Sequence, residues 1–183
     1  MKKNILMTIA CLLPILAACS AGDEALKEIT NDPAYRNDVK NAAQEGAFKD
    51  KTADEAFEAA RDTDTHAQYV AFLEIYPESA HGAEVEELLT RFKVFSTKET
   101  RQLESETLEE MCWPEAGRIF QWRQGGTAGS IVMGGSPALF GPIMLWSETG
   151  SIQLISGSYS NKNGGVEVGA GTRIIYSTKC HGS

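Results

Sequence analysis

The sequence predicts an α+β protein, in which a small N-terminal helical bundle or hairpin is followed by a small antiparallel β-sheet or barrel domain. Residues 33–111 carry apolar side chains at helical spacing, whereas residues 112–183 form short alternating runs separated by glycine-rich turns. The charge changes at the same point. Ser20 to Trp113 contains 22 acidic and 10 basic residues, and Pro114 to Ser183 contains 3 and 5. We therefore expect a domain boundary near Trp113.

The acidic excess limits which partners the protein can have. The formal net charge is −8. Nucleic-acid binding needs clustered lysine and arginine, so we expect no nucleic-acid partner. The same charge argues against a body that lies flat on an anionic membrane. The simplest interpretation of the acidic excess is a solvated helical surface.

The N-terminus has the layout of a secretory signal peptide over residues 1–18. Lys2 and Lys3 precede an apolar run from Ile5 to Ala18, which is shorter than the roughly 20 residues of a membrane-spanning helix. The run ends in Leu16-Ala17-Ala18-Cys19. This segment resembles the lipobox of bacterial lipoproteins, and the resemblance implies cleavage before Cys19 and acylation of its thiol. The alternative is an ordinary signal peptide that is cut near Ala18 without lipidation.

The lipobox resemblance also predicts where the protein resides. Two or more acyl chains are needed to hold a protein stably at a bilayer. In lipoproteins of Gram-negative bacteria, a serine after the lipidated cysteine, here Ser20, goes with export to the outer membrane. We therefore expect a protein that is anchored in the envelope through Cys19 and faces the periplasm. Residues 19–32 read as a polar tether that is partly helical around 25–29.

Helix start signals divide the region 33–111. Asp32 and Pro33 predict a helix from Pro33 to about Phe48. Thr52 and Glu55 have the spacing of a capping box, and Ser96-Thr97-Lys98-Glu99 looks like a second one. The apolar residues of the expected helices are, in chain order, Tyr35, Val39 and Ala42; Ala56, Phe57 and Ala60; Tyr69, Phe72, Leu73 and Tyr76; Val85, Leu88, Leu89, Phe92 and Phe95; and Leu103, Leu108 and Met111.

The third of these stripes carries a second resemblance. Tyr69, Phe72-Leu73 and Tyr76-Pro77-Glu78-Ser79, followed by Ala83 and Leu88, are similar to the linked helices of bacterial tetratricopeptide-like modules. Only one partial unit is visible, with His81-Gly82 and Val85 departing from the pattern, so we expect a hairpin or small bundle rather than a repeat array. Such modules mostly bind proteins or peptides, which makes Tyr69, Phe72 and Tyr76 candidate partner-binding residues. The alternative is that these aromatic residues form the core.

After Trp113 the sequence predicts about five short strands. They lie near 118–123, 131–133, 138–146 and 152–156, and on one alternating face from Val166 to Tyr176. Asn161 to Gly165 is the strongest hairpin signal. Gly141-Pro142 should bend the apolar run 138–146 or confine it to a sheet edge. If that run is exposed, Phe140 and Trp146 become further candidate partner-binding residues.

Cys112 and Cys180 bracket the glycine-rich half and are the only mature cysteines besides Cys19. An exported protein meets an oxidising environment, so we expect a disulfide between them. Free thiols and a metal site are the alternatives. No Cys-x-x-Cys pair is present, and we expect no metal and no cofactor.

No spacing in the sequence specifies a reaction. His66, His81 and His181 are scattered, and we expect His66 and His81 to face solvent. No phosphate-binding glycine loop or Gly-x-Ser-x-Gly elbow is present. We therefore predict a non-enzymatic interaction module with an unidentified envelope protein partner. A ligand-binding or enzyme-inhibiting lipoprotein with a β-barrel is the alternative, and an envelope hydrolase is the third hypothesis.

Overall fold

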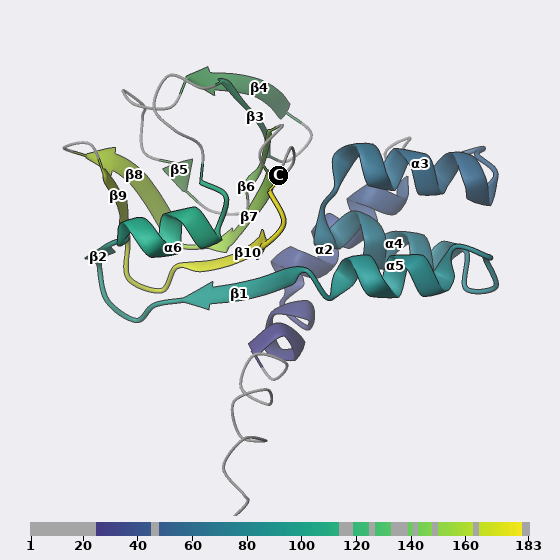
Figure 1. Cartoon of the computed structure of the whole chain (residues 1–183), viewed down its shortest axis with the longest axis horizontal. Coiled ribbons are helices and arrows are strands. Elements are labelled where there is room, and N and C mark those ends of the chain that lie inside the picture. The colour runs from purple at the N-terminus through teal and green to yellow at the C-terminus, as the bar shows by residue number, and fades with distance from the viewer. Residues whose placement is uncertain are drawn as a thin grey trace, which may run out of the picture.

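Three layers build the protein in a computed structural model: a group of helices, a six-stranded sheet, and a four-stranded sheet with one further helix (Figure 1). The structure describes residues 25–44, 48–113, 119–124, 127–132, 139–140, 143–147, 150–162 and 165–180. The expected signal peptide 1–18 and Cys19 lie outside these ranges. The helices come first in the chain, and most of the strands follow. The predicted α+β class is therefore confirmed.

Four helices fill the first layer, together with a helical segment at 25–30. Thr52 caps α3 as predicted, because its hydroxyl accepts from the Glu55 N–H at 3.3 Å and the Glu55 carboxylate accepts from the Thr52 N–H at 2.9 Å. Asp32 caps α2 by accepting from the Ala34 N–H at 2.8 Å. The helices are α2 Pro33–Gln44, α3 Ala53–Thr63, α4 His66–Ile75 and α5 Gly82–Leu89.

The part of the expected tether that the structure describes, 25–32, belongs to the folded body. Ile29 is buried in the helical core, and Asp32 forms an ion pair with Arg173 on the sheet. The expectation of a tether up to residue 32 is therefore wrong over these residues, although the helix expected around 25–29 is present. Among the described residues, no helix is long and apolar enough to cross a membrane.

Antiparallel pairing organises both sheets. The larger sheet has the order β1-β10-β7-β6-β3-β4, and the smaller has the order β2-β9-β8-β5. The predicted hairpin around 161–165 is present, with Lys162 opposite Gly165. The strands are β1 Phe92–Ser96, β2 Arg101–Gln102, β3 Ile119–Gln124, β4 Thr127–Val132, β5 Leu139–Phe140, β6 Ile143–Ser147, β7 Gly150–Ser156, β8 Ser158–Lys162, β9 Gly165–Val168 and β10 Arg173–Ser177.

Strands β7 and β10 of the larger sheet are buried on both faces, and their side chains alternate between two cores. On β10, Ile175 packs against the helices, whereas Ile174 and Tyr176 face the smaller sheet and α6 (Ser105–Glu110). On β7, Ile155 faces the helices and Leu154 faces the smaller sheet. The middle layer therefore joins the helical part to the β part.

Two predicted elements are wrong because strand pairing overrides local sequence signals. Phe92 and Phe95 were expected on the helix that contains Val85, but that helix ends at Leu89 and both lie on β1, paired with β10. The expected capping box at 96–99 does not start a helix: Ser96 is the last residue of β1, and the Thr97 N–H donates to the Thr172 carbonyl at 3.0 Å. The region 33–111 is therefore not wholly helical.

The alternating face predicted from Val166 to Tyr176 also belongs to two strands. Val166 and Val168 lie on β9 in the smaller sheet, and Ile174 and Tyr176 lie on β10 in the larger one. The chain turns between them at Gly171, whose φ of 74° lies in the left-handed region. The predicted disulfide is present: Cys112 after α6 and Cys180 after β10 are bonded, with 5.4 Å between their Cα atoms.

Two glycines provide a test of how tightly the β layers pack. Gly157, between β7 and β8, has a φ of 89°, and a Cβ there would lie 2.5 Å from the Thr172 Cα atom. Gly171 also has a positive φ but has open space around it. We predict that Gly171→Ala lowers the free energy of unfolding by about 1 kcal/mol through backbone strain alone. Gly157→Ala should lower the free energy of unfolding by about 1 to 3 kcal/mol more than Gly171→Ala, because its Cβ atom overpacks against Thr172. Urea denaturation measures both values. Equal losses would contradict this packing.

Candidate functional site

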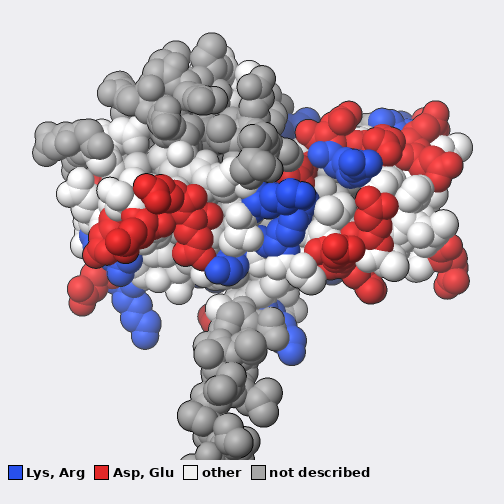
Figure 2. Space-filling view, viewed as in Figure 1, with Lys and Arg blue, Asp and Glu red and all other residues white. Residues whose placement is uncertain are grey.

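A cleft of about 500 Å³ lies where the helices meet the C-terminal end of the chain. The helical side contributes three carboxylates, from Glu58, Asp62 and Glu84. The side that follows β10 contributes Lys179 and Cys180. Figure 2 shows lysine and arginine side chains gathered near this junction, between acidic surfaces on both parts of the molecule. The remaining lining residues are Arg61, Asp64, Tyr69, Leu88 and Arg91.

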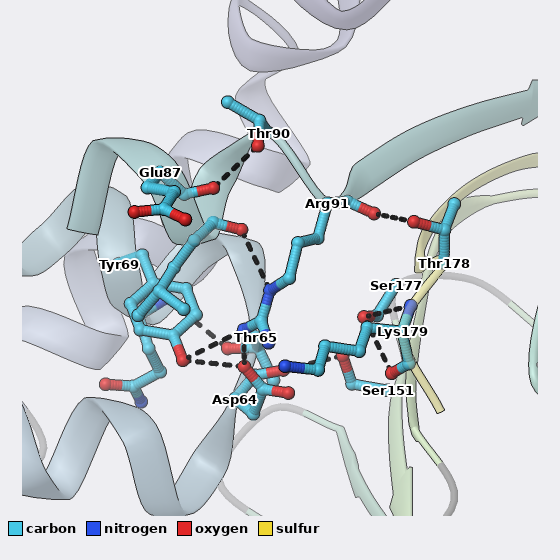
Figure 3. Close-up of polar contacts among 12 residues, drawn as sticks. Asp64, Thr65, Tyr69, Glu87, Thr90, Arg91, Ser151, Ser177, Thr178 and Lys179 are labelled. Atoms are coloured by element: carbon cyan, nitrogen blue, oxygen red, sulfur yellow. Dashed lines mark hydrogen bonds and ion pairs between the residues drawn. The ribbon is translucent and has the colours of Figure 1, made fainter. Parts of the chain in front are cut away.

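Asp64 organises the inner wall of this cleft. It ends α3 in the left-handed conformation, with a φ of 46°, and it is only 3% exposed. Its Oδ1 atom accepts from the Tyr69 hydroxyl at 2.6 Å and from the Arg91 Nη2 atom at 2.6 Å (Figure 3). Its backbone carbonyl accepts from the Ser151 hydroxyl at 2.7 Å. Charge-assisted bonds of this kind are stronger than neutral ones, so they fix the carboxylate in place.

Arg91 extends the same network to the sheet. Its Nε atom donates to the Leu88 carbonyl at 3.2 Å, near the end of α5. Its own carbonyl accepts from the Thr178 N–H at 2.9 Å and from the Thr178 hydroxyl at 2.8 Å. Lys179 comes next in the chain, and its side chain runs along the cleft toward Asp64 (Figure 3). The network therefore holds the ends of α3, α5 and β10 together.

Burial and hydrogen bonding determine the protonation state of the Tyr69 hydroxyl in the cleft. Burial raises the pKa of the Tyr69 hydroxyl, and its hydrogen bond to Asp64 raises it further. Tyr69 therefore remains a protonated donor. Arg91 donates to the same carboxylate. The cleft is also lined by the carboxylates of Glu58, Asp62 and Glu84 and by the cationic side chains of Arg61 and Lys179.

The helical aromatics do not form the partner-binding surface that the sequence suggested. Tyr69 is 1% exposed and Phe72 is 0% exposed, so the prediction for these two residues is wrong and their role is in the core. Tyr76 is partly buried, and its hydroxyl donates to the Lys51 carbonyl at 2.8 Å. The backbones of Phe140 and Trp146 lie on β5 and β6, but their side chains lie outside the described part of the structure.

The two histidines that the structure describes lie apart from the cleft. His66 was expected to face solvent but is buried, with Nδ1 2.7 Å from the Tyr35 hydroxyl and its ring edge-on to Phe92. His81 is partly exposed, and its Nε2 atom lies 2.8 Å from the Asp54 carboxylate. Both therefore hold helices together. His181 lies outside the described residues.

Sequence reasoning missed the residues that build the cleft. In the sequence, Asp64 is an acidic residue between two expected helices, and no motif distinguishes it from its neighbours. Its partners Arg91, Ser151 and Lys179 come from distant parts of the chain, so no local spacing could relate them. The only sequence signal was the cluster of acidic and hydroxyl residues at 62–65.

The comparisons with known proteins add no functional assignment. No protein-family description, no curated protein and no solved structure gives a significant match to the chain. In the described ranges, no group of three or more histidine, cysteine or acidic side chains is placed to hold a metal ion. The interpretation of the cleft therefore depends on its own residues.

His66 generates a prediction about pH. Burial lowers the pKa of His66 from 6.5 to about 4, so the folded state favours the neutral ring. The unfolded chain therefore binds the proton first, and stability is lost as the pH falls from about 6.5 toward 4. The loss should reach about 3 kcal/mol, measured by urea denaturation at several pH values.

His66→Gln is the control for this prediction, because glutamine is polar but does not titrate. Burial raises the pKa of Asp38, so protonation of Asp38 increases the stability of the folded state as the pH falls, opposite to the effect of His66. The quantity to compare is therefore the slope of unfolding free energy against pH in the two proteins. The wild type should lose more stability than the variant over this range. Equal slopes would contradict the assignment to His66.

Proposed function

We propose that this protein is a lipid-anchored lipoprotein of the bacterial envelope, held at the outer membrane and facing the periplasm, which binds a second envelope protein without catalysing a reaction. The observation that carries the anchoring is the sequence Leu16-Ala17-Ala18-Cys19, which follows an apolar signal segment. On this proposal, Cys19 becomes the N-terminal residue and carries the acyl chains.

The start of the folded body supports a location close to the bilayer. Ala25, the first residue that the structure describes, is helical, and Ile29 is already buried in the core. Six peptide steps separate Cys19 from Ala25, and they span at most about 22 Å. A body on so short a connection stays near the membrane that holds the lipid. It could then meet partners that are embedded in, or bound to, the same surface.

The disulfide is consistent with an exported protein. Cys112 and Cys180 are bonded, and disulfides persist in oxidising compartments such as the bacterial periplasm. The bond closes a loop with a sequence separation of 68. In the chain-entropy model, a loop of this length stabilises the folded state by about 4 kcal/mol. A body that depends on this bond would be disadvantaged in a reducing cytoplasm.

The cleft is the surface that best fits partner binding. Its helical side carries Glu58, Asp62 and Glu84 together with Arg61, Lys179 lies on the side that follows β10, and its inner wall is fixed by the Asp64–Arg91 ion pair. A partner segment with basic residues facing the helices would complement the helical side. The cleft replaces the aromatic surface expected from the sequence, since Tyr69 and Phe72 are buried.

Metabolic labelling tests the anchor. Cells that express the full-length protein are supplied with a radioactive or clickable fatty acid, and the purified protein is examined for label. We predict labelling of the wild type and loss of label in Cys19→Ser, because the acylated thiol is absent. Label that survives the substitution, or an unlabelled wild type, would contradict lipidation at Cys19.

Site-specific photo-crosslinking in intact cells tests the cleft. Glu84 lines the cleft and Glu86 does not, although both are exposed on α5. A photoreactive amino acid at position 84 should capture a defined envelope protein, and one at position 86 should not. The additional substitution Glu58→Lys should weaken capture by reversing the charge of the wall. Equal capture from both positions would contradict binding in the cleft.

A further inference from the structure

We propose that the Cys112–Cys180 disulfide is a thiol-exchange site, at which a thiolate carried by a cationic molecule or segment attacks the Sγ atom of Cys180 from the cleft. This inference goes beyond the proposed function. It requires only the folded body, and it holds whether or not Cys19 is acylated. It assigns the cleft a covalent chemistry for partners that contain a thiol next to positive charge.

The two cysteines differ in exposure. Cys180 is partly exposed and lines the cleft of about 500 Å³. Cys112 is 5% exposed, belongs to the buried part of the structure, and is not among the residues that line the cleft. Thiol–disulfide exchange depends on access to the sulfur that is attacked. The attack is therefore directed to Cys180, and Cys112 is the departing sulfur.

The charges around the cleft select the kind of thiol. Glu58, Asp62 and Glu84 face the cleft from the helices, and Arg61 is near Glu58 on the same helix. Arg91 is engaged by Asp64, which leaves the ammonium of Lys179 as the cation beside Cys180 in the chain. A cationic thiol can place its positive group against the carboxylates while its thiolate approaches Lys179. An anionic thiol would meet the same carboxylates unfavourably.

The exchange step balances without a further oxidant or reductant. The incoming thiolate forms a new S–S bond with Sγ of Cys180, and the Cys112–Cys180 bond breaks. Its electron pair goes to Sγ of Cys112, which leaves as a thiolate and takes a proton from water. The incoming sulfur is oxidised to the disulfide level and Cys112 is reduced. The product is a mixed disulfide on Cys180.

The backbone next to each cysteine indicates which constraints would change when the disulfide opens. Cys112 follows α6 with a φ of 51°, a left-handed conformation that is unfavourable for a residue with a side chain. Thr178, two residues before Cys180, is held by the carbonyl of Arg91. Once the bond between the sulfurs opens, the hydrogen bonds of Thr178 still connect the segment after β10 to Arg91. Exchange would therefore couple a covalent event to the Asp64–Arg91 network.

Trapping the mixed disulfide tests which sulfur is attacked. The full-length protein in detergent micelles is treated with limiting cysteamine under native conditions, quenched with N-ethylmaleimide and mapped by peptide mass spectrometry, which separates the peptides of Cys112, Cys180 and Cys19. We expect cysteamine on Cys180 and maleimide on Cys112, with at least tenfold preference. Cysteamine on Cys112, an equal distribution, or reaction only in urea that unfolds the protein would overturn the proposal.

A series of probe thiols tests the charge selection. At equal thiolate concentration and low salt, the exchange rate should fall from cysteamine to 2-mercaptoethanol to 3-mercaptopropionate, with about three- to tenfold between the first and last. Glu84→Gln should reduce the differences in exchange rate between the three thiols, and the control Glu86→Gln should leave them unchanged. The reverse order, the absence of any order, or equal effects of the two variants would overturn the part of the proposal that depends on the helical carboxylates.

Discussion

The ion pair between Asp64 and Arg91 is the constraint on which the arrangement of this protein depends. A carboxylate that is 3% exposed would be costly without compensation, and here Arg91 and the Tyr69 hydroxyl both bind its Oδ1 atom at 2.6 Å. The backbone of each partner in the pair is also engaged, Asp64 by Ser151 and Arg91 by Thr178. Segments from both halves of the sequence therefore meet at one buried charge. Loss of either side chain would leave the other charge without its partner.

This network explains why the cleft is where it is. The helices and the larger sheet share a core, in which Phe92, Ile155 and Ile175 pack with the helical aromatics. The Asp64–Arg91 network lies at the edge of that core. It lines the cleft together with Cys180 of the Cys112–Cys180 bond. A binding site at such a joint can respond to both layers, because its walls come from different parts of the fold.

How much was predictable from the sequence depended on how local each signal was. The Thr52–Glu55 capping box and the hairpin at 161–165 depend on neighbouring residues, and both predictions are confirmed. Phe92 and Phe95 continued a helical spacing, yet pairing with β10 places them on a strand. Tyr69 and Phe72 were assigned to the correct helix, but their burial depends on distant residues: Phe92 of β1 packs on Tyr69, and Phe57 of α3 packs on Phe72. The cleft was not predictable, because Asp64, Arg91 and Lys179 meet only in the folded chain.

The most direct test is whether the two layers unfold together through this ion pair. All three tryptophans, Trp113, Trp122 and Trp146, lie in the β half, so their fluorescence reports the sheets while far-ultraviolet circular dichroism reports mainly the helices. In urea, the two signals of the wild type should change in a single coincident transition. In Asp64→Asn, the helical signal should be lost at lower urea than the fluorescence signal. A variant whose two transitions stay coincident at the wild-type midpoint would contradict the central role of this ion pair.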